Sequence, residues 1–389
     1  MAKLDFTIDQ VGEPTLDSPL EDAGFVSDDD RISFFSHRHK LAQLEMPPAE
    51  LPGFEAAGPR NKIYHDPAWT QAAIVTCGGL CPGINDVIKS IVNTLHHSYG
   101  VRNVHGIPYG YRGLVPKYQL EPIPLTPDIV DTIHENGGSV LGSSRGPQDT
   151  EEIVRTLHQR NIGLLFAIGG DGTQRGAGEI AEACMAKGLP ISVIGIPKTI
   201  DNDLSFMDRT FGFETAVYAS GPVISAANDE AKGAYNGIGL VKLMGRESGF
   251  IAAAATLANS VVNFCMIPEV PLSLDGPDGF LAAIERRLQE KNHVVVVVAE
   301  GAGQNLFQGD NTARDASGNV TFNDVGLFLK QRIGEHLRQQ GIEHAIKYFD
   351  PSYLIRSVPA RGTDAIFCLH LAQNAVHAAM AGKTNMVMG

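Results

Sequence analysis

The chain has 389 residues and is 43% hydrophobic, which is enough apolar material to bury large cores and build two domains. Its formal net charge of −13 argues against nucleic acid as the main partner and means that anionic substrates need a locally basic site. No apolar run approaches the about 20 residues of a membrane span, and residues 1–30 lack the pattern of a signal peptide. The five cysteines have no paired metal spacing and suit reduced thiols, so we expect a cytoplasmic protein that binds no membrane.

Residues 1–70 show no clear periodicity, and we expect them to form an extension wrapped on the core. From residue 72, short apolar segments alternate with helical patterns. The expected strands are 72–76, 103–107, 164–168, 191–196, 239–243, 261–266 and 294–298. This alternation predicts parallel sheets with right-handed crossovers, which is an α/β fold. Residues 307–321 are rich in Asn, Asp and Gly and predict either a mobile loop or an inert surface insertion.

A glycine-rich cluster, Gly169–Thr173, follows the expected strand 164–168 and precedes an expected helix at 179–187. Such a turn lets backbone N–H groups and the positive end of a helix approach a phosphate without an intervening side chain. Asp171 adds a hard oxygen ligand that suits magnesium carried on that phosphate. The alternative is a tight turn in which Asp171 only caps the helix.

A second cluster, Pro197–Asp203, begins where the expected strand 191–196 leaves its sheet. Both clusters therefore lie at the carboxyl ends of strands, where open α/β sheets bind their ligands. Of the two carboxylates Asp201 and Asp203, one can accept a hydroxyl proton while the other binds a metal. The alternative is that this segment is only an acidic loop on the surface. Together the two clusters point to phosphoryl transfer from a nucleotide to a sugar phosphate.

Six further segments complete a specific order of motifs. They are Cys77–Asn85, Tyr109–Leu114, Leu141–Gly146, Met244–Phe250, Ala299–Gly303 and Pro351–Arg356. With these segments the chain, from about residue 72 onward, resembles the 6-phosphofructokinase family, in its ATP-dependent branch related to pyrophosphate-dependent enzymes. The resemblance implies two Rossmann-like three-layer domains with mainly parallel sheets and an active site in the cleft between them.

The resemblance also implies a division of the chain. Residues 1–70 form the N-terminal extension, 71–212 with about 357–381 the nucleotide-binding domain, and 213–356 the sugar-phosphate-binding domain. The nucleotide is expected to contact Gly79, Arg145, Gly146, Gly170, Asp171, Gly172 and Thr173, with Mg²⁺ held by Asp171. The sugar phosphate is expected to contact Thr199, Ile200, Asp201, Met244, Gly245, Arg246, Glu300, Lys347, Tyr353, Leu354, Ile355 and Arg356. Of these, Lys347, Tyr353 and Arg356 resemble the cluster that holds the 6-phosphate of the sugar in the family.

By the same resemblance, Asp201 accepts the proton of the 1-hydroxyl of fructose 6-phosphate while that hydroxyl attacks the γ-phosphorus of ATP, giving fructose 1,6-bisphosphate for glycolysis. Thr199 and Asp203 shape the loop, while Arg246 and Lys198 neutralise the developing charge. Most of these residue types also have ordinary structural uses, such as surface arginines, packed tyrosines or a glutamate that starts a helix. The order of the motifs favours the functional interpretation.

Two residues bear on the identity of the phosphoryl donor, and they favour different donors. Lys198 is typical of pyrophosphate users, whereas Gly172 is typical of ATP users, because an Asp at that position would crowd and repel the α-phosphate of ATP. We expect ATP. The alternatives are a pyrophosphate-dependent phosphofructokinase or an inactive nucleotide-binding regulatory paralogue. A lipid or NAD kinase shares the turn at Gly169–Thr173 but lacks the later motifs.

The family habit is a homo-oligomer, dimer or tetramer. Two features depart from the family pattern. Gly237 stands where many relatives have an arginine that reaches a neighbouring subunit, and family chains normally continue beyond the segment 382–389.

Overall fold

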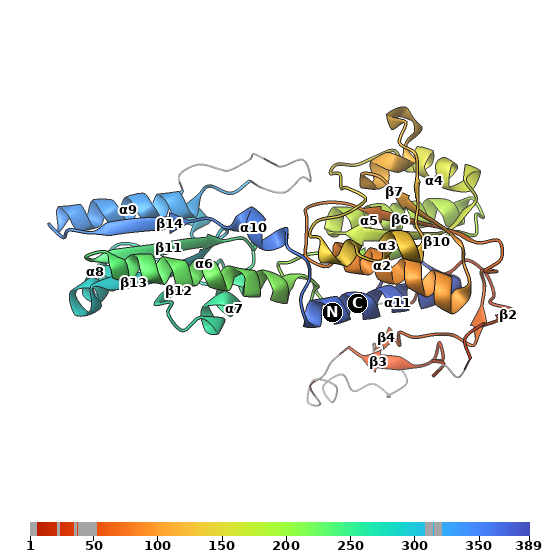
Figure 1. The fold of residues 1–389 in the computed structure, drawn as a ribbon, viewed down its shortest axis with the longest axis horizontal. Coiled ribbons are helices and arrows are strands. Elements are labelled where there is room, and N and C mark those ends of the chain that lie inside the picture. The colour runs from red at the N-terminus through yellow and green to blue at the C-terminus, as the bar shows by residue number, and fades with distance from the viewer. Residues whose placement is uncertain (1–5, 22–23, 35–36, 38–52, 308–313, 315–320) are drawn as a thin grey trace. The chain divides into compact units, whose positions relative to one another are not determined.

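The computed structural model describes the whole chain except residues 1–5, 22–23, 35–36, 38–52, 308–313 and 315–320 (Figure 1). Most of the loop expected at 307–321 therefore lies outside the described residues. The chain forms two compact units. Unit 1 consists of Met1–Gly79, Ile84–Lys198 and Ile366–Gly389, and unit 2 of Leu80–Gly83 and Thr199–Ala365. Each unit has its own sheet, and the predicted α/β class is confirmed.

The sheet of unit 1 has six strands in the order β16-β10-β9-β6-β7-β8. Their bounds are β6 Gln71–Thr76, β7 Asn103–Ile107, β8 Ile123–Pro124, β9 Ile162–Gly169, β10 Ser192–Pro197 and β16 Met386–Val387. All neighbours are parallel except β7 and β8. The central strands β6, β9 and β10 are almost continuously apolar because both of their faces are covered by helices.

Four helices cover this sheet. Figure 1 shows α4 (Thr150–Gln159) and α5 (Asp171–Ala186) on one face, and α2 (Ile84–Asn93) and α11 (Thr363–Met380) on the other. A π-helical turn, Thr94–Tyr99, continues α2. Short helical segments lie at α3 Pro127–Val130 and at the 3₁₀ turns Gly110–Leu114, Pro116–Tyr118 and Ile133–Glu135.

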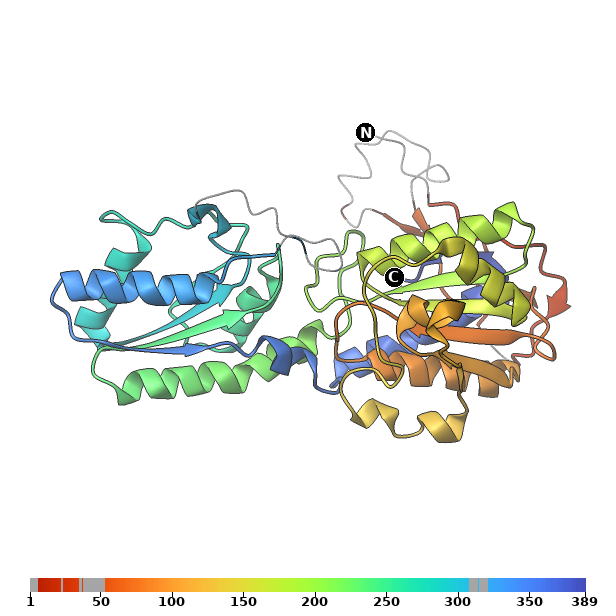
Figure 2. The same ribbon diagram turned by 90° about the horizontal axis from the view of Figure 1, so that it is seen from above.

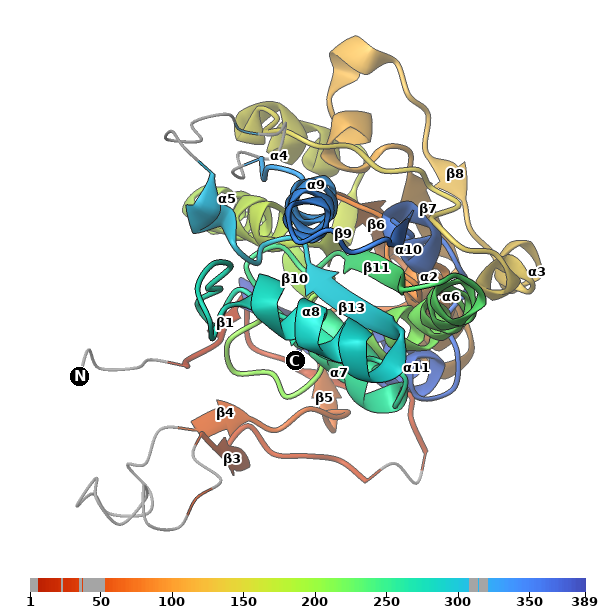
Figure 3. The same ribbon diagram turned by 90° about the vertical axis from the view of Figure 1, so that its left-hand side faces the viewer.

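The sheet of unit 2 has four parallel strands in the order β12-β13-β11-β14. They are β11 Gly237–Leu243, β12 Phe264–Met266, β13 His293–Ala299 and β14 Ala345–Phe349. The helices are α6 Phe213–Gly233, α7 Phe250–Ala258, α8 Phe280–Lys291, α9 Val325–Gln339 and the short α10 Ser352–Arg356, with a 3₁₀ turn at Gln304–Leu306. Figure 2 shows α9 lying along this sheet, and Figure 3 shows β13 beside β11.

All seven expected strands are present, although the one expected at 261–266 is shorter. The chain passes from unit 1 to unit 2 after Lys198 and returns to unit 1 after Ala365. The boundaries predicted from the sequence fall at residues 212 and 356 instead. The assignment of one part to the nucleotide and the other to the sugar phosphate stays a prediction. Within the described ranges, no helix combines the length and apolar character that crossing a membrane requires.

The described part of the N-terminal extension contains very short strands, one of which pairs with a strand near the end of the chain while the others pair within the extension. Strand β1 (Asp9–Gln10) lies antiparallel to β15 (Lys383–Thr384). Strand β2 (Leu16–Asp17) pairs with β5 (Lys62–Ile63), and β3 (Arg31–Ser33) pairs with β4 (Gly53–Glu55). Pairings this short need further contacts to hold them.

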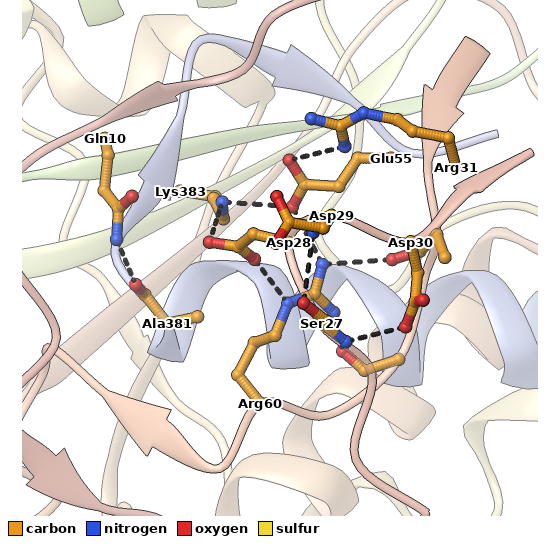
Figure 4. Close-up of polar contacts among 12 residues, drawn as sticks. Gln10, Ser27, Asp28, Asp29, Asp30, Arg31, Glu55, Arg60, Ala381 and Lys383 are labelled. Atoms are coloured by element: carbon orange, nitrogen blue, oxygen red, sulfur yellow. Dashed lines mark hydrogen bonds and ion pairs between the residues drawn. The ribbon is translucent and has the colours of Figure 1, made fainter. Parts of the chain in front are cut away.

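Those contacts come from a cluster of charged side chains that joins the extension to residues late in the chain (Figure 4). The ammonium of Lys383 lies 2.9 Å from Asp28 and 3.0 Å from Glu55. Arg60 binds the same two carboxylates, at 2.7 Å and 2.8 Å respectively. The side chains of Lys383 and Glu55 are only 6% and 7% exposed. Buried charges of this kind need opposite charges as partners: Lys383 has two, Asp28 and Glu55, and Glu55 has three, because Arg31 also lies 3.5 Å away.

Candidate active site

The two motif clusters leave neighbouring strands of unit 1. Strand β9 ends at Gly169 and is followed by Gly170 and α5, while β10 ends at Pro197. The backbone N–H of Lys198 donates to the carbonyl of Gly169 over 3.0 Å, which extends the pairing of β9 and β10 beyond the strands. The carbonyl of Gly170 accepts from the N–H groups of Thr173 and Gln174, at 2.8 Å and 3.0 Å. The cluster is therefore a strand-to-helix turn, as its sequence predicts.

The glycines of this turn differ in what the fold demands of them. A Cβ on Gly169 would collide with the hydroxyl of Thr173, so packing alone requires that glycine. A Cβ on Gly172 would meet only the guanidinium of Arg175, at 4.0 Å, and one on Gly170 only the Lys198 carbonyl, at 3.6 Å. Neither Gly170 nor Gly172 has a positive φ. The fold therefore leaves their missing side chains unexplained, whereas close approach of a phosphate to the backbone N–H groups explains them.

A third turn, at the end of β6, joins the same edge. Gly78 has φ +85°, its N–H donates to the Ser144 carbonyl over 3.0 Å, and its own carbonyl accepts from the Ser143 hydroxyl over 2.6 Å. A Cβ on Gly78 would lie 3.7 Å from Nζ of Lys198. The structure thus brings the motifs that contain Gly78, Ser143 and Lys198 together. Gly79, Arg145 and Gly146 adjoin these residues in the chain.

The thiol of Cys77 lies in this region but is not a nucleophile. Burial raises its pKa to about 11, although the backbone of Tyr111 and the charge of Lys198 oppose this shift. A thiol with that pKa stays protonated at neutral pH. The chemistry of the turn therefore comes from its backbone and from Lys198.

In unit 2 the site is organised around Asp201. Its backbone N–H donates to the hydroxyl of Thr199 over 3.0 Å, and its carbonyl accepts from the hydroxyl of Ser248 over 2.9 Å. The Thr199 hydroxyl also lies 3.4 Å from Asp203, as expected for residues that shape one loop. Asp201 is 8% exposed, and no described residue offers a hydrogen bond to its Oδ1 atom.

Arg246 is fixed at its backbone by Glu300. Arg246 adopts φ +51°, a conformation that is costly for a side chain of this size. Its N–H donates to Oε1 of Glu300 over 2.9 Å, and the N–H of Gly245 reaches the same oxygen over 3.3 Å. Glu300 follows β13 directly, so its carboxylate holds the turn after β11 from the neighbouring strand. Met244 precedes this turn and is half-buried.

The charges of this site set the protonation of Asp201. Burial raises its pKa to about 6, the negative charges of Asp203 and Glu300 add to the rise, and Arg246 opposes it. Asp201, Asp203 and Arg246, three of the residues proposed for catalysis, therefore act on one another electrostatically within unit 2. A carboxylate with a pKa near 6 is ionised at neutral pH yet basic enough to take a proton.

The expected 6-phosphate residues divide into two groups. Tyr353 and Arg356 lie on α10, with the guanidinium carbon 4.7 Å from the centre of the tyrosine ring. Tyr353 and Leu354 are exposed, and Ile355 is buried. Lys347 lies inside β14 instead, opposite Gly239 of β11, and its ammonium is 3.6 Å from Glu230. Because β11 continues for four residues beyond Gly239, Lys347 stands about 13 Å short of the strand end that leads to Arg246.

Asp171 is the expected magnesium ligand. It is an exposed carboxylate at the first residue of α5. In the part of the chain that the structure describes, no three His, Cys, Asp or Glu side chains gather in a way that could hold a metal ion. One carboxylate beside a phosphate-binding turn fits magnesium, which takes most of its ligands from phosphates and water in such sites.

Two residues that contact this site were not among the site residues predicted from the sequence. Ser248 binds the Asp201 carbonyl, and Glu269 accepts the N–H of Gly249 over 2.8 Å at the start of α7. Ser248 belongs to a motif that the sequence singles out. Glu269 follows β12 by three residues and could have been found by the rule that polar residues after parallel strands gather at one edge.

Comparison with known proteins decides the family. A family model described as phosphofructokinase matches residues 71–379. The chain belongs to the phosphofructokinase family. The resemblance predicted from the sequence is confirmed, and so is its extent from about residue 72 onward.

Curated phosphofructokinases match nearly the whole chain. An ATP-dependent 6-phosphofructokinase of Borreliella burgdorferi is 49% identical over 398 residues, covering 99% of this chain and 88% of the relative. ATP-dependent 6-phosphofructokinase 7 of Arabidopsis thaliana is 49% identical over 338 residues, covering 86% of this chain and 69% of the relative. Among solved structures, a pyrophosphate-dependent phosphofructokinase from Marinobacter aquaeolei has a TM-score of 0.66 at 24% identity, over 81% of this chain and 77% of that chain. At that identity the solved structure supports the fold alone.

Proposed function

We propose that the chain is an ATP-dependent 6-phosphofructokinase that transfers the γ-phosphoryl group of ATP to the 1-hydroxyl of fructose 6-phosphate. The observation that carries this proposal is the buried Oδ1 atom of Asp201, which no described residue satisfies. An unsatisfied buried carboxylate oxygen costs free energy in the free protein, and the hydroxyl of a bound substrate removes that cost. The curated relatives are named ATP-dependent 6-phosphofructokinases, which supports both the substrate and the donor.

Asp201 accepts the proton of the sugar hydroxyl in this scheme. Its pKa of about 6 gives the carboxylate the basicity for the step at neutral pH. The hydroxyls of Thr199 and Ser248 hold the backbone of Asp201 on either side, so the loop that carries the carboxylate is fixed. Arg246, held by Glu300, stabilises the charge of the transferring group.

Residues of unit 1 bind the nucleotide in the same scheme. The N–H groups at Gly170 and Gly172, where the glycines carry no side chain to block an approaching group, receive its phosphates, and Lys198 neutralises their charge from beside Gly78. Thr173, Gly79, Arg145 and Gly146 complete the nucleotide contacts. Mg²⁺ bound with ATP and held by Asp171 supplies charge neutralisation at the phosphates. Unit 2 binds the sugar phosphate through Thr199 to Asp201, Met244 to Arg246, Glu300 and the α10 residues Tyr353, Leu354, Ile355 and Arg356, with Arg356 at the 6-phosphate. Lys347 stays a predicted contact, because its place inside β14 does not bring it to the strand end.

The proposal extends to the protein's setting. We infer a homo-oligomer, dimer or tetramer, that works in the cytoplasm, where glycolytic substrates are found. A pyrophosphate-dependent reaction is the second candidate, because Lys198 has the identity typical of pyrophosphate users.

One coupled assay tests the proposal. Purified protein is given fructose 6-phosphate and Mg²⁺ with either ATP or pyrophosphate, and formation of fructose 1,6-bisphosphate is followed. Activity with ATP that exceeds activity with pyrophosphate supports the proposal. Activity with pyrophosphate alone would favour the second candidate, and activity with neither would indicate a regulatory paralogue.

A further inference from the structure

Lys242 is a charged residue in the sheet of unit 2 that the proposed reaction does not use. It is the sixth residue of β11, immediately before the segment that leads to Met244 and Arg246. Its ammonium lies 3.0 Å from Asp324 and 2.9 Å from Asp350, and its side chain is 12% exposed. A buried ammonium is retained only where its partners compensate for the lost hydration.

Each of the two partners begins a different helix. Asp324 accepts the N–H of Leu327 over 3.0 Å at the start of α9, and it also accepts the phenol of Tyr348 over 3.2 Å. Asp350 accepts the N–H of Ser352, the first residue of α10, over 3.2 Å. One ammonium therefore joins the end of β11 to the starts of α9 and α10.

The register of the sheet explains the contact with Asp350. In the parallel pairing of β11 and β14, Val241 lies opposite Phe349, so the next residues along the two strands are Lys242 and Asp350. Helix α10 begins two residues after Asp350 and presents the stacked pair Tyr353 and Arg356. The path from the sheet to Arg356 is thus short and passes through the Asp350 contact.

All three charges persist in the folded protein. Burial disfavours the ammonium of Lys242, but its hydrogen bonds to Asp350 and Asp324 outweigh this and hold its pKa above the ordinary value. Burial alone would raise the pKa of both aspartates. The hydrogen bonds from Ser352 and Lys242 lower the pKa of Asp350, and those from Leu327 and Lys242 lower the pKa of Asp324.

We propose that Lys242 is a positioning residue for the sugar-phosphate site: through Asp350 it fixes α10, and with it the guanidinium of Arg356 that receives the 6-phosphate. This inference rests on the proposed function, which gives Arg356 that role. A guanidinium binds phosphate oxygens through a planar fork, so a displacement or rotation of its helix weakens binding even when the arginine itself is intact.

The test compares Michaelis constants in the full chain. Lys242→Met and Asp350→Asn are each assayed with varied fructose 6-phosphate and with varied ATP. Asparagine at position 350 keeps an acceptor for the Ser352 N–H but removes the ion pair, so this variant decides the question if Lys242→Met does not fold. We expect KM for fructose 6-phosphate to rise about tenfold or more in both variants, with KM for ATP within about twofold. The matched control is Arg332→Met, which removes an ion pair of 2.8 Å with Asp275 in the same unit and should leave both constants unchanged.

Arg356→Met and the double variant Lys242→Met/Arg356→Met complete a double-mutant cycle. If Lys242 acts through Arg356, the double variant is no worse than Arg356→Met alone. Multiplied effects in the double variant, or an equal rise of KM for both substrates, overturn the positioning role and leave the proposed function standing. An Arg356→Met variant with unchanged KM for fructose 6-phosphate refutes the phosphate role of Arg356 and the inference with it.

Discussion

The hydroxyl of Ser248 donates a 2.9 Å hydrogen bond to the backbone carbonyl of Asp201. This contact joins the turn after β11 to the loop that carries the proposed base, entirely within unit 2. The same hydroxyl also accepts the N–H of Phe250 at the start of α7, over 3.3 Å. Asp201 is thus held by its backbone, while its carboxylate keeps an oxygen that no described residue satisfies.

Replacing Asp201 by Asn should change activity and stability in opposite directions. Without the base, kcat should fall by about 10²–10⁴-fold with little change in KM. The free energy of unfolding at pH 7–8 should rise by about 1–3 kcal/mol, because a buried charge with a raised pKa is removed. Turnover assays and urea denaturation check the two effects. Asp229→Asn, which changes an exposed acid on α6, serves as the control, and near-normal turnover in Asp201→Asn would exclude the assigned role.

The pH dependence of activity should report the same carboxylate. Only ionised Asp201 accepts a proton, so kcat/KM should fall about tenfold per pH unit below pH 6. The effect of Asp201 on stability has the opposite pH dependence: its contribution becomes more favourable as the pH falls. Because the folded-state pKa of about 6 exceeds the ordinary 3.8, the ionised carboxylate destabilises the fold above pH 6, and this destabilisation is relieved between pH 6 and pH 4.

A neighbouring charge provides the check on this assignment. Asp203 raises the pKa of Asp201, so Asp203→Asn should move the inflection of kcat/KM to lower pH. An inflection that stays at the same pH in Asp203→Asn would assign the titration to another group.

Gly172 should control the choice of phosphoryl donor. Gly172→Asp places a carboxylate where the nucleotide phosphates are expected, so kcat/KM for ATP should fall far more than any activity with pyrophosphate. Gly172→Ala is the matched control: in the free protein its Cβ would meet only the Arg175 guanidinium at 4.0 Å, so this variant separates the effect of added bulk beside a bound phosphate from the effect of the added charge. The ratio of kcat/KM for the two donors is the measurement, and an unchanged ratio in Gly172→Asp would remove the turn from donor selection.

The charged cluster that binds the N-terminal extension should matter far more than an exposed ion pair nearby. Lys383→Met leaves Asp28 and Glu55 with Arg60 as their shared cation, and we expect a loss of about 3 kcal/mol of unfolding free energy. Lys62→Met breaks a 2.6 Å pair with Asp17 that is largely exposed and should cost less than about 1 kcal/mol. Urea denaturation of both variants gives the comparison, and equal losses would show that burial does not set the strength of the cluster.

The strands that the sequence reveals are those buried on both faces, such as β9, β10 and β13, because their apolar runs are continuous. Strand β14 was not expected. Its middle residue, Lys347, is exposed, and none of its five residues is fully buried, so it lacks that apolar signal. Strands β15 and β16 have two residues each and depend on distant partners, β1 and β10, which no local pattern can encode.

In the candidate site, too, some features follow from a local sequence pattern and others depend on contacts between distant segments. The glycine turn and the acidic cluster could be predicted because each follows a strand, and the rule for strand ends marks such segments as candidate ligand sites. The backbone contacts of Glu300 and Ser248 were not visible, since they depend on which loop faces which. Lys347 illustrates the limit most clearly, because only the register with Gly239 reveals how far it stands from the strand end.

Unit 1 is built from three separate stretches of the chain, so the order of synthesis on the ribosome affects when each unit can fold. Unit 2 is almost a single stretch, and its last residue, Ala365, is made before the final stretch of unit 1, Ile366–Gly389. That stretch supplies most of α11, the strand beside β10 and the buried Lys383. Until it emerges, the β10 edge lacks its neighbour and the carboxylate of Glu55 lacks one of its cations, so we expect unit 2 to complete its folding first. Protease resistance of arrested nascent chains should therefore appear in unit 2 before unit 1, even though residues 1–79 are synthesised first.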